Sequence, residues 1–331
     1  MLALAAIVID QTRHEGDPPA AIGAVFVGAG DIAECETEGD EETAALLDDV
    51  VEDHPDAVVF TTGDNAYPDG SYDDYVDCYG PSWGRHKSRT RPAVGNHEFK
   101  QTRAGGYNRY WGAAGGEFDL YYYSYDVAEW HIVVLNSECH RVGCDFNSED
   151  GDQVEWLEAD LAASSANCTI AIWHHPRWSS GRYSNDDEYD TFWEVLHNHG
   201  VEIVLNGHEH LYERFEPMNP AGDLDAKGGI TQFTVGTGRR QPSPVREHQA
   251  AQRSTCIGAW RPEAHARERR IRVGVPTRRW RPIQRLGHGD VPWCRRIASA
   301  RPGSTIVGGL WRARRDSNPR PADPKSAALI H

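Results

Sequence analysis

The stretch Ala57–Tyr67 reads AVVFTTGDNAY. Its first six residues are apolar or β-branched, a composition typical of a strand that is buried on both faces. Gly63 and Asp64 follow directly, so the chain is expected to turn where the strand ends and to bring a carboxylate to that end. The same order, a short apolar run and then a polar cluster, recurs along the chain and predicts its fold.

The chain alternates between short apolar runs and stretches with helical periodicity. Similar apolar runs are Ile22–Val27, His131–Leu135, Thr169–Trp173, Val201–Leu205 and Thr231–Val235. Helical periodicity is present in Glu41–Val51, Gln153–Ala163 and Tyr189–His197. This alternation favours an α/β fold built on a layered sheet. A short link separates Leu120–Asp126 from Trp130–Leu135, which predicts an added antiparallel pair of strands.

Polar clusters follow most of the apolar runs. The clusters are Gly30-Asp31, Gly63-Asp64-Asn65-Ala66-Tyr67, Gly95-Asn96-His97-Glu98, His174-His175 and Gly207-His208-Glu209-His210. Asp31 and Asp64 are 33 residues apart, Asp64 and Asn96 are 32 apart, and His174 and His208 are 34 apart. Each interval suits one strand–helix–strand unit. We therefore expect the clusters at the carboxyl ends of strands, where α/β sheets gather their binding sites.

The side chains in these clusters favour a metal centre. They are carboxylates, imidazoles, an amide and a phenol, without a thiolate, and such a set suits Fe, Zn or Mn rather than a soft metal. Because they outnumber the ligands of one ion, we expect two ions that share a carboxylate. A pair of this kind can activate a hydroxide as the nucleophile and neutralise phosphate oxygens during an in-line displacement.

Taken singly, each cluster has an ordinary structural explanation. Gly30-Asp31 alone is typical of a turn. Gly95–Glu98 alone could begin a capped helix, and His174-His175 could be two partly buried histidines. His208 and His210 are more informative, because strand alternation places both side chains on one side. The occurrence of five clusters in order favours the metal centre over these explanations.

The ordered motifs GD, GDNAY, GNHE, HHP and GHEHLYER resemble those of the calcineurin-like metallophosphoesterases. They are most similar to the purple acid phosphatase branch, and the resemblance covers residues 24–238. Ala33 stands where many members of the superfamily carry a ligand histidine, and Tyr67 stands where the purple acid phosphatases carry a tyrosine instead. The resemblance implies an α/β/β/α sandwich and hydrolysis of phosphate esters, as by an acid phosphatase, with a binuclear metal centre.

The resemblance also divides the candidate ligands between two ions. Fe(III), which a phenolate favours, is implied at a site made by Asp31, Asp64, Tyr67 and His210. A divalent Zn, Mn or Fe ion is implied at a second site made by Asp64, Asn96, His174 and His208. Asp64 is then the ligand that the two ions share.

Further side chains receive roles from the same resemblance. His97 is similar to the histidine that contacts the substrate phosphate and protonates the leaving group, and Glu98 is expected to orient it. His175 is expected to support the ligands from behind. Tyr212-Glu213-Arg214 is expected to stabilise the loop that carries the last two histidines.

Two features depart from the plant members of the branch. Arg177–Tyr183 lacks the histidine pair that they carry after the fourth motif, so Arg177 or Arg182 could contact phosphate instead, although such arginines are more often surface residues. We also expect no large N-terminal β-domain, because about 22 residues precede the first predicted strand.

Charge divides the chain at Gly238. Residues 1–238 hold 13 Lys+Arg and 44 Asp+Glu, a net charge of −31, and residues 239–331 hold 21 and 6, a net charge of +15, which together give −16. We expect an N-terminal segment over residues 1–21, a phosphoesterase domain over 22–238 and an Arg-rich tail over 239–331. In the acidic domain, metal ions rather than the net charge would attract a phosphate.

The Arg-rich tail has no sustained periodicity, and several interpretations compete for it. A nucleic-acid-binding arm, a disordered tail and a small appended domain are alternatives, although four tryptophans are unusual in a disordered tail. We favour a shift of reading frame near Gly238, which makes the tail irregular or out of frame. The sheet would then lack its last strands and expose Thr231–Val235 as an edge.

These interpretations leave alternatives for function. A phosphodiesterase or nucleotidase of the same fold is the alternative to a phosphomonoesterase. An inactive phosphatase-fold protein that binds nucleic acid through the tail is the alternative from another class. We expect a small phosphate ester, rather than nucleic acid, as the partner.

The cysteines and the apolar stretches bear on localisation. No apolar stretch approaches the ~20 residues of a membrane span, and Met1–Ile9 lacks the basic residues that begin a signal peptide. Cys139 with Cys144 and Cys35 with Cys78 are candidate disulfides, with buried free cysteines as the alternative. Together with the family resemblance, these pairs favour an extracytoplasmic or secreted protein.

Overall fold

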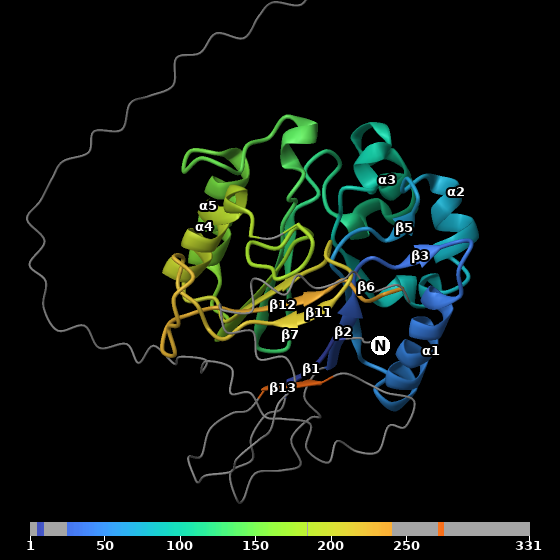
Figure 1. The fold of residues 1–331 in the computed structure, drawn as a ribbon, viewed down its shortest axis with the longest axis horizontal. Coiled ribbons are helices and arrows are strands. Elements are labelled where there is room, and N and C mark those ends of the chain that lie inside the picture. The colour runs from blue at the N-terminus through green and yellow to red at the C-terminus, as the bar shows by residue number, and fades with distance from the viewer. Residues whose placement is uncertain (1–4, 10–24, 184, 240–270, 275–331) are drawn as a thin grey trace, which may run out of the picture. The chain divides into compact units, whose positions relative to one another are not determined.

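The computed structural model describes residues 5–9, 25–183, 185–239 and 271–274. Two β-sheets pack face to face at the centre of these residues, and helices cover the outer faces (Figure 1). This arrangement is the predicted α/β/β/α sandwich, so the fold class is confirmed. Among the described residues, no helix is long and apolar enough to cross a membrane.

The first sheet has the strand order β13-β1-β2-β4-β6. Its strands are β1 (Ala5–Ile9), β2 (Val25–Ala29), β4 (Val58–Thr61), β6 (Thr90–Pro92) and β13 (Ile271–Gly274). β2, β4 and β6 run parallel, so their carboxyl ends lie at one edge of the sheet. β1 pairs antiparallel with β2 and β13, and both β1 and β13 come from outside the range expected for the domain.

The second sheet has the strand order β11-β12-β10-β9-β8-β7. Its strands are β7 (Tyr123–Val127), β8 (Trp130–Val134), β9 (Cys168–Ile172), β10 (Ile203–Asn206), β11 (Tyr212–Arg214) and β12 (Thr231–Val235). β8, β9, β10 and β12 run parallel. β7 and β8 form the predicted antiparallel pair.

The expectation that Thr231–Val235 forms an exposed edge is wrong. β11 pairs antiparallel with it, from Tyr212 opposite Val235 to Arg214 opposite Phe233. The chain turns back after the GHEH motif and covers that edge itself. The frame shift and the other interpretations of the tail concern residues 239–331. The structure describes only Arg239 and β13 of this range, and the rest lies outside the described residues.

A third, two-stranded sheet lies beside the first. β3 (Ala33–Glu34) and β5 (Ala66–Tyr67) pair in parallel, with Glu34 opposite Tyr67. This pairing joins the loop after β2 to the loop after β4, the two loops that begin with the predicted aspartate ligands.

The α-helices form the outer layers. They are α1 (Gly39–Asp53), α2 (Tyr72–Asp74), α3 (Gly105–Trp111), α4 (Asp152–Ala163) and α5 (Asp190–Asn198). A π-helical turn spans Tyr75–Tyr79, and 3-10 turns span Trp83–Arg89, Glu98–Lys100, Thr102–Ala104, Gly112–Gly115, Cys139–Val142 and Asp187–Tyr189. In Figure 1, α1, α2 and α3 lie on one side of the sheets, and α4 and α5 lie on the other.

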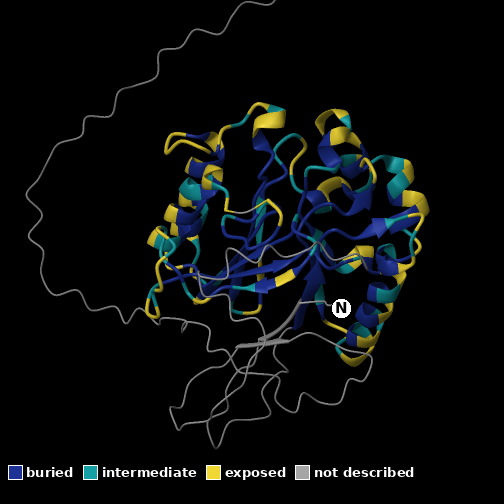
Figure 2. Ribbon diagram, viewed as in Figure 1, coloured by how far each residue is buried: buried dark blue, intermediate teal, exposed yellow. Residues whose placement is uncertain are grey.

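Three apolar clusters fill the spaces between the layers. The cluster between the sheets contains Phe26 and Phe60 of the first sheet against residues of the second such as Ile170. A second cluster joins the first sheet to α1 and α3, and a third joins the second sheet to α4 and α5. The central strands, such as β2, β8, β10 and β12, are accordingly buried, and exposed residues gather on the outer sides of the helices (Figure 2). Apolar burial on both faces explains why most strands read as continuous apolar runs.

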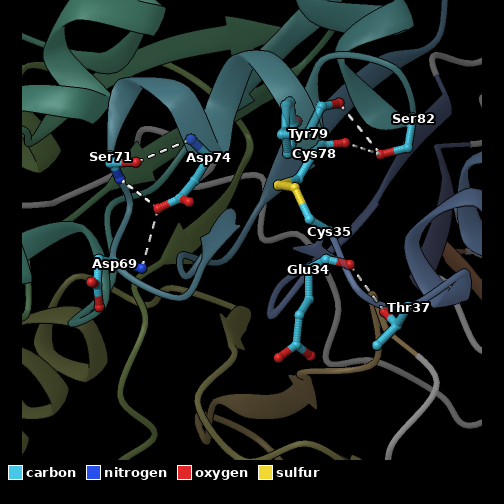
Figure 3. The surroundings of a disulfide bond; sticks show 9 residues. All are labelled: Glu34, Cys35, Thr37, Asp69, Ser71, Asp74, Cys78, Tyr79 and Ser82. Atoms are coloured by element: carbon cyan, nitrogen blue, oxygen red, sulfur yellow. Dashed lines mark hydrogen bonds between the residues drawn. A yellow bond between two sulfur atoms is a disulfide. The ribbon is translucent and has the colours of Figure 1, made fainter.

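Both candidate disulfides are present. Cys35 bonds to Cys78 and Cys139 bonds to Cys144. Figure 3 shows the first bond, which joins the loop after β3 to the π-helical turn. Nearby, Ser71 and Asp74 form a reciprocal pair of hydrogen bonds at the start of α2. The disulfide therefore fixes the segment that places Glu34 opposite Tyr67.

Candidate metal centre

The predicted ligands lie where strands of the two sheets end. Asp31, Asp64 and His208 follow β2, β4 and β10, and they have positive φ angles of 58°, 49° and 65°. Residues other than glycine rarely adopt this conformation, and such backbone strain is concentrated at functional sites. Gly63 has a φ of 93°, and a Cβ atom there would lie 2.6 Å from Nδ1 of His174. Glycine thus lets the β4 loop approach the loop after β9 (Cys168–Ile172).

The four predicted ligands of the first ion converge on the hydroxyl of Tyr67. This hydroxyl lies 2.9 Å from Oδ1 of Asp31 and 3.1 Å from Oδ2 of Asp64. Nε2 of His210 lies 3.3 Å from the same hydroxyl and 3.2 Å from Oδ1 of Asp31. We call these four residues the first ligand group.

The four predicted ligands of the second ion are also close together. Oδ1 of Asn96 lies 3.0 Å from Nε2 of His174 and 3.1 Å from Nδ1 of His208. Oδ2 of Asp64 lies 3.3 Å from Nε2 of His174. Asp64 therefore touches both groups, as the sequence predicts for a shared ligand. We call Asp64, Asn96, His174 and His208 the second ligand group.

The atoms that face one another in the second group suit a cation. Nδ1 of His174 lies 2.8 Å from the carbonyl oxygen of Thr62, to which it donates. In a neutral ring, Nε2 is then an acceptor, and it faces the acceptor oxygens of Asn96 and Asp64. A proton or a metal ion must lie between these atoms. An imidazole held by a backbone carbonyl on its other nitrogen is the usual arrangement of a metal-bound histidine.

The charges of the buried groups also call for cations. Burial raises the pKa of Asp31, but its hydrogen bond with His210 and the charge of His174 outweigh this, and the pKa is lowered overall. Burial lowers the pKa of His174, but the charge of Asp64 outweighs this and raises it to about 10. Burial and the charge of His174 lower the pKa of His208 to about 4. Two ionised, buried carboxylates thus need positive charge beside them.

His97 lies next to both groups. Its backbone N–H donates to Oδ1 of Asp64 at 2.8 Å, and its Nε2 lies 3.8 Å from Oδ2 of Asp64. Its ring packs against the ring of Tyr67, with centroids 4.3 Å apart. On the far side, Nδ1 contacts the carbonyl oxygen of Pro68, and Nζ of Lys100 lies 2.9 Å from Nδ1.

Glu98 has contacts different from those implied by the resemblance. Its carboxylate accepts hydrogen bonds from the backbone N–H groups of Gly95, Asp64 and Asn65 at 2.8, 3.1 and 2.8 Å, and from the hydroxyl of Tyr75 at 2.9 Å. None of these described hydrogen bonds of Glu98 runs to His97. Burial and the charge of Asp64 raise the pKa of Glu98 to about 7. Glu98 therefore holds two ligand loops together, while Pro68 and Lys100 contact the ring of His97.

His175 lies behind the second group. Its Nδ1 lies 2.9 Å from the hydroxyl of Ser137, and its ring lies 4.3 Å from that of His208. Its ring also stacks on Tyr189, with centroids 5.8 Å apart. Nitrogen atoms of His174, His175 and His208 are close enough to share an ion, as are ligand atoms of Asp31, Asp64 and His174.

Glu209 and Arg239 also belong to this region, and the sequence interpretation missed their roles. Glu209 is fully buried and accepts hydrogen bonds from the loop after His175. Its position between two histidines could have indicated this supporting role, because strand alternation turns its side chain away from theirs. Arg239 lies 4.1 Å from the ring centroid of Tyr67 and 3.2 Å from Nδ1 of His210, and it pairs with Glu34 at 2.7 Å. It was assigned to the tail.

Arg177 and Arg182 do not contact the ligand groups in the described contacts. Arg177 forms an ion pair with Asp190 and lies 4.0 Å from the ring of Trp178. Arg182 is exposed and lies over the ring of Tyr183, 5.6 Å away. Glu213 of the YER run accepts a hydrogen bond from the backbone N–H of Ser180 at 3.0 Å.

The fold and the two ligand groups agree with a known class of proteins. Residues 24–212 match the family described as calcineurin-like phosphoesterase. Since the match covers more than half of the sequence, the chain belongs to the calcineurin-like phosphoesterase family.

Purple acid phosphatases are among its relatives. The chain is 29% identical over 262 residues to purple acid phosphatase 22 of Arabidopsis thaliana, covering 70% of this chain and 56% of the relative. It is 28% identical over 257 residues to purple acid phosphatase 18 of the same plant, covering 71% and 54%. These matches confirm the resemblance predicted from the motifs. The chain spans about half the length of these relatives.

A solved structure shares the fold. It is that of a purple acid phosphatase from yellow lupin (Lupinus luteus) seeds, with a TM-score of 0.54 and 16% sequence identity, covering 67% of this chain and 45% of that one. At this identity the match supports the fold rather than the ligands.

Proposed function

We propose that the chain is a metal-dependent phosphomonoesterase with a binuclear centre. One observation carries the proposal: two four-residue ligand groups meet at Asp64, whose Oδ2 lies 3.1 Å from the hydroxyl of Tyr67 and 3.3 Å from Nε2 of His174. Two groups that share one carboxylate are the arrangement expected of a two-metal hydrolase. Family membership and the purple acid phosphatase relatives support the same reaction class.

The two groups would hold different ions. The first contains two carboxylates and a phenol with one imidazole, and its phenolate favours Fe(III). The second contains one carboxylate, an amide and two imidazoles, which suits a divalent Zn, Mn or Fe ion. When bound, such ions activate a water molecule as the nucleophile and neutralise charge on the phosphate oxygens.

His97 would supply the proton for the leaving group. In its protonated form, Nδ1 donates to the carbonyl of Pro68, so Nε2 points toward the side of Asp64 and keeps an N–H for a substrate oxygen. The contact with Tyr67 and the backbone bond to Asp64 restrict the ring. A positioned imidazolium of this kind contributes as a general acid.

The proposal is tested on the full chain. We expect about two metal ions per chain by elemental analysis, a visible phenolate–Fe(III) absorption band, and hydrolysis of phosphate monoesters in preference to diesters. A chain that binds no metal, or one that cleaves only diesters, would contradict the proposal. The second result would favour the phosphodiesterase alternative.

The same proposal includes an extracytoplasmic location. The two disulfides support it, because such bonds persist in oxidising compartments. Fractionation of the native source, with antibody detection, would test the location independently of the activity.

A further inference from the structure

Tyr183 lies beside the candidate metal centre without belonging to either ligand group. The centroid of its ring is 4.4 Å from that of His208, at an interplanar angle of 32°. Even so, 56% of Tyr183 is exposed. Among the large exposed hydrophobic side chains in the described part of the chain, Tyr183 is the one with a ring contact to a candidate ligand.

Two buried carboxylates hold the loop that carries Tyr183. Glu209 accepts hydrogen bonds from the backbone N–H groups of Arg182, at 2.9 Å, and Tyr183, at 2.5 Å. Glu213 accepts one from the backbone N–H of Ser180 at 3.0 Å. Because both carboxylates are buried, these loop donors satisfy groups that would otherwise lack partners.

Gly181 shows how closely the loop packs against Glu209. A Cβ atom at position 181 would lie 2.3 Å from the carboxylate carbon of Glu209. Glu209 stands between His208 and His210 in the sequence, so one residue fixes both the ligand loop and the Tyr183 loop. The ring of Tyr183 is thus held beside His208 before any substrate binds.

The residues of the candidate centre differ in exposure. Four of its residues are buried: Asp31, Asp64, Tyr67 and His174. Four others are partly exposed: Asn96, His97, His208 and His210. A substrate therefore approaches from the side of the second set, which is the side where Tyr183 lies against His208.

We propose that Tyr183 makes this site selective for phosphate monoesters whose alcohol carries an aromatic ring. The inference rests on the proposed phosphomonoesterase function. With the phosphate at the ligand groups, the alcohol faces the more exposed residues of the centre. There the exposed part of the Tyr183 ring, with Arg182 5.6 Å from its centroid, offers an aromatic surface. Because Glu209 already holds the loop, little conformational freedom is lost when the alcohol stacks on the ring.

The test compares benzyl phosphate with ethyl phosphate, since both release a primary alcohol and only the first carries an aromatic ring. The readout is the ratio of kcat/KM for benzyl over ethyl phosphate. Tyr183→Ala is expected to lower this ratio on the order of 3- to 10-fold, mainly by raising KM for benzyl phosphate. Tyr183→Phe is expected to preserve the ratio. Gly181→Ala, which displaces the loop from Glu209, is expected to lower it as well.

Phe118→Ala is the matched control. Phe118 is 52% exposed, and its described ring contacts are with Tyr121 and Arg103 rather than with a candidate ligand. Its loss should leave the ratio unchanged. Metal content is measured for every variant, because Tyr183 touches His208.

The outcomes separate the two proposals. An unchanged ratio in Tyr183→Ala and Gly181→Ala, with the metal content of the parent chain, overturns the inference and leaves the phosphomonoesterase proposal standing. An equal fall in Phe118→Ala also overturns it. A metal-loaded parent chain that hydrolyses neither ester refutes the phosphomonoesterase function, and the inference falls with it.

Discussion

The two sheets contribute different chemistry to the candidate centre. Loops of the first half of the chain supply the oxygen atoms, from Asp31, Asp64, Tyr67 and Asn96. Loops of the second sheet supply the nitrogen atoms, from His174, His208 and His210. Each ligand group therefore needs both sheets. Neither half offers a complete set for either ion, so bound ions would fasten the two sheets together.

The two ligand groups also differ in their share of oxygen and nitrogen atoms. In the first group the oxygen atoms of three residues meet at the Tyr67 hydroxyl with one imidazole beside them. In the second group an amide oxygen lies between two imidazoles. Under the proposed function, this composition would favour a harder ion in the first group and a divalent ion in the second. Variants that remove one ligand atom at a time test this division.

Asp64→Ala has the largest expected effect, because Asp64 alone belongs to both groups. We expect loss of both metal ions and a fall in kcat/KM for a phosphate monoester on the order of 1,000-fold or more, since the metals supply several kcal/mol of charge stabilisation. Elemental analysis and steady-state kinetics check this. Asp73→Ala, which removes an exposed carboxylate in α2, is the control. Full metal content in Asp64→Ala would rule out a shared ligand.

The two disulfides should contribute differently to the free energy of unfolding of the two halves. Cys35–Cys78 spans 43 residues in the first half, whereas Cys139–Cys144 spans 5 in the second. Loop entropy predicts that their removal lowers the free energy of unfolding by about 4 and about 2 kcal/mol, respectively. Paired Cys→Ser variants and guanidinium unfolding measure both values. The reverse order would show that local packing, rather than loop closure, decides the contribution of each bond.

Tyr67→Phe separates the two groups directly. It removes the phenol oxygen of the first group and leaves all four residues of the second. We expect the visible absorption band to disappear, the first ion to bind more weakly, and kcat/KM to fall about 100-fold, while the second ion stays bound. Absorption spectra and metal titrations follow each ion. Tyr212→Phe, a change at a more exposed tyrosine, is the matched control. Equal loss of both ions would contradict the division into two groups.

The positions of the candidate ligands at strand ends follow from the sequence more directly than the shorter strands around them do. Asp31, Asp64 and His208 stand at the ends of apolar runs, so their convergence followed from the α/β pattern alone. β6 reads Thr-Arg-Pro and β11 reads Tyr-Glu-Arg, and neither forms an apolar run. Such short, polar strands form because they pair with a neighbouring strand. That pairing depends on the tertiary fold and is not visible in the local sequence.

The roles of Glu98 and Arg239 also depended on distant residues. The family resemblance implied that Glu98 orients His97, yet the carboxylate of Glu98 accepts hydrogen bonds from backbone N–H groups of the β4 loop. Arg239 stands at the compositional break and was grouped with the basic residues that follow. Only the pairing of Glu34 with Tyr67 brings a partner and a ring to it.

The smallest expected effect concerns His131 of the second sheet, which joins β8 to α4. Nδ1 of His131 lies 2.8 Å from Asp126, and its Nε2 lies 2.7 Å from Asp160 of α4. The hydrogen bond with Asp160 raises the pKa of His131. Its stabilising effect is therefore complete below about pH 6.5, the ordinary pKa of histidine, and is lost as pH rises through the raised pKa.

His131→Gln should lower the free energy of unfolding by about 1.5 kcal/mol at pH 6 and by less at pH 9. Urea unfolding at both pH values measures the change. In the first half, His86 lies 2.6 Å from Asp48, whose side chain is 44% exposed, so His86→Gln should cost only ~0.5 kcal/mol. An equal cost for His131→Gln at both pH values would mean that packing, rather than charge, joins β8 to α4. The second sheet would then hold α4 by apolar packing, as the first sheet holds α1.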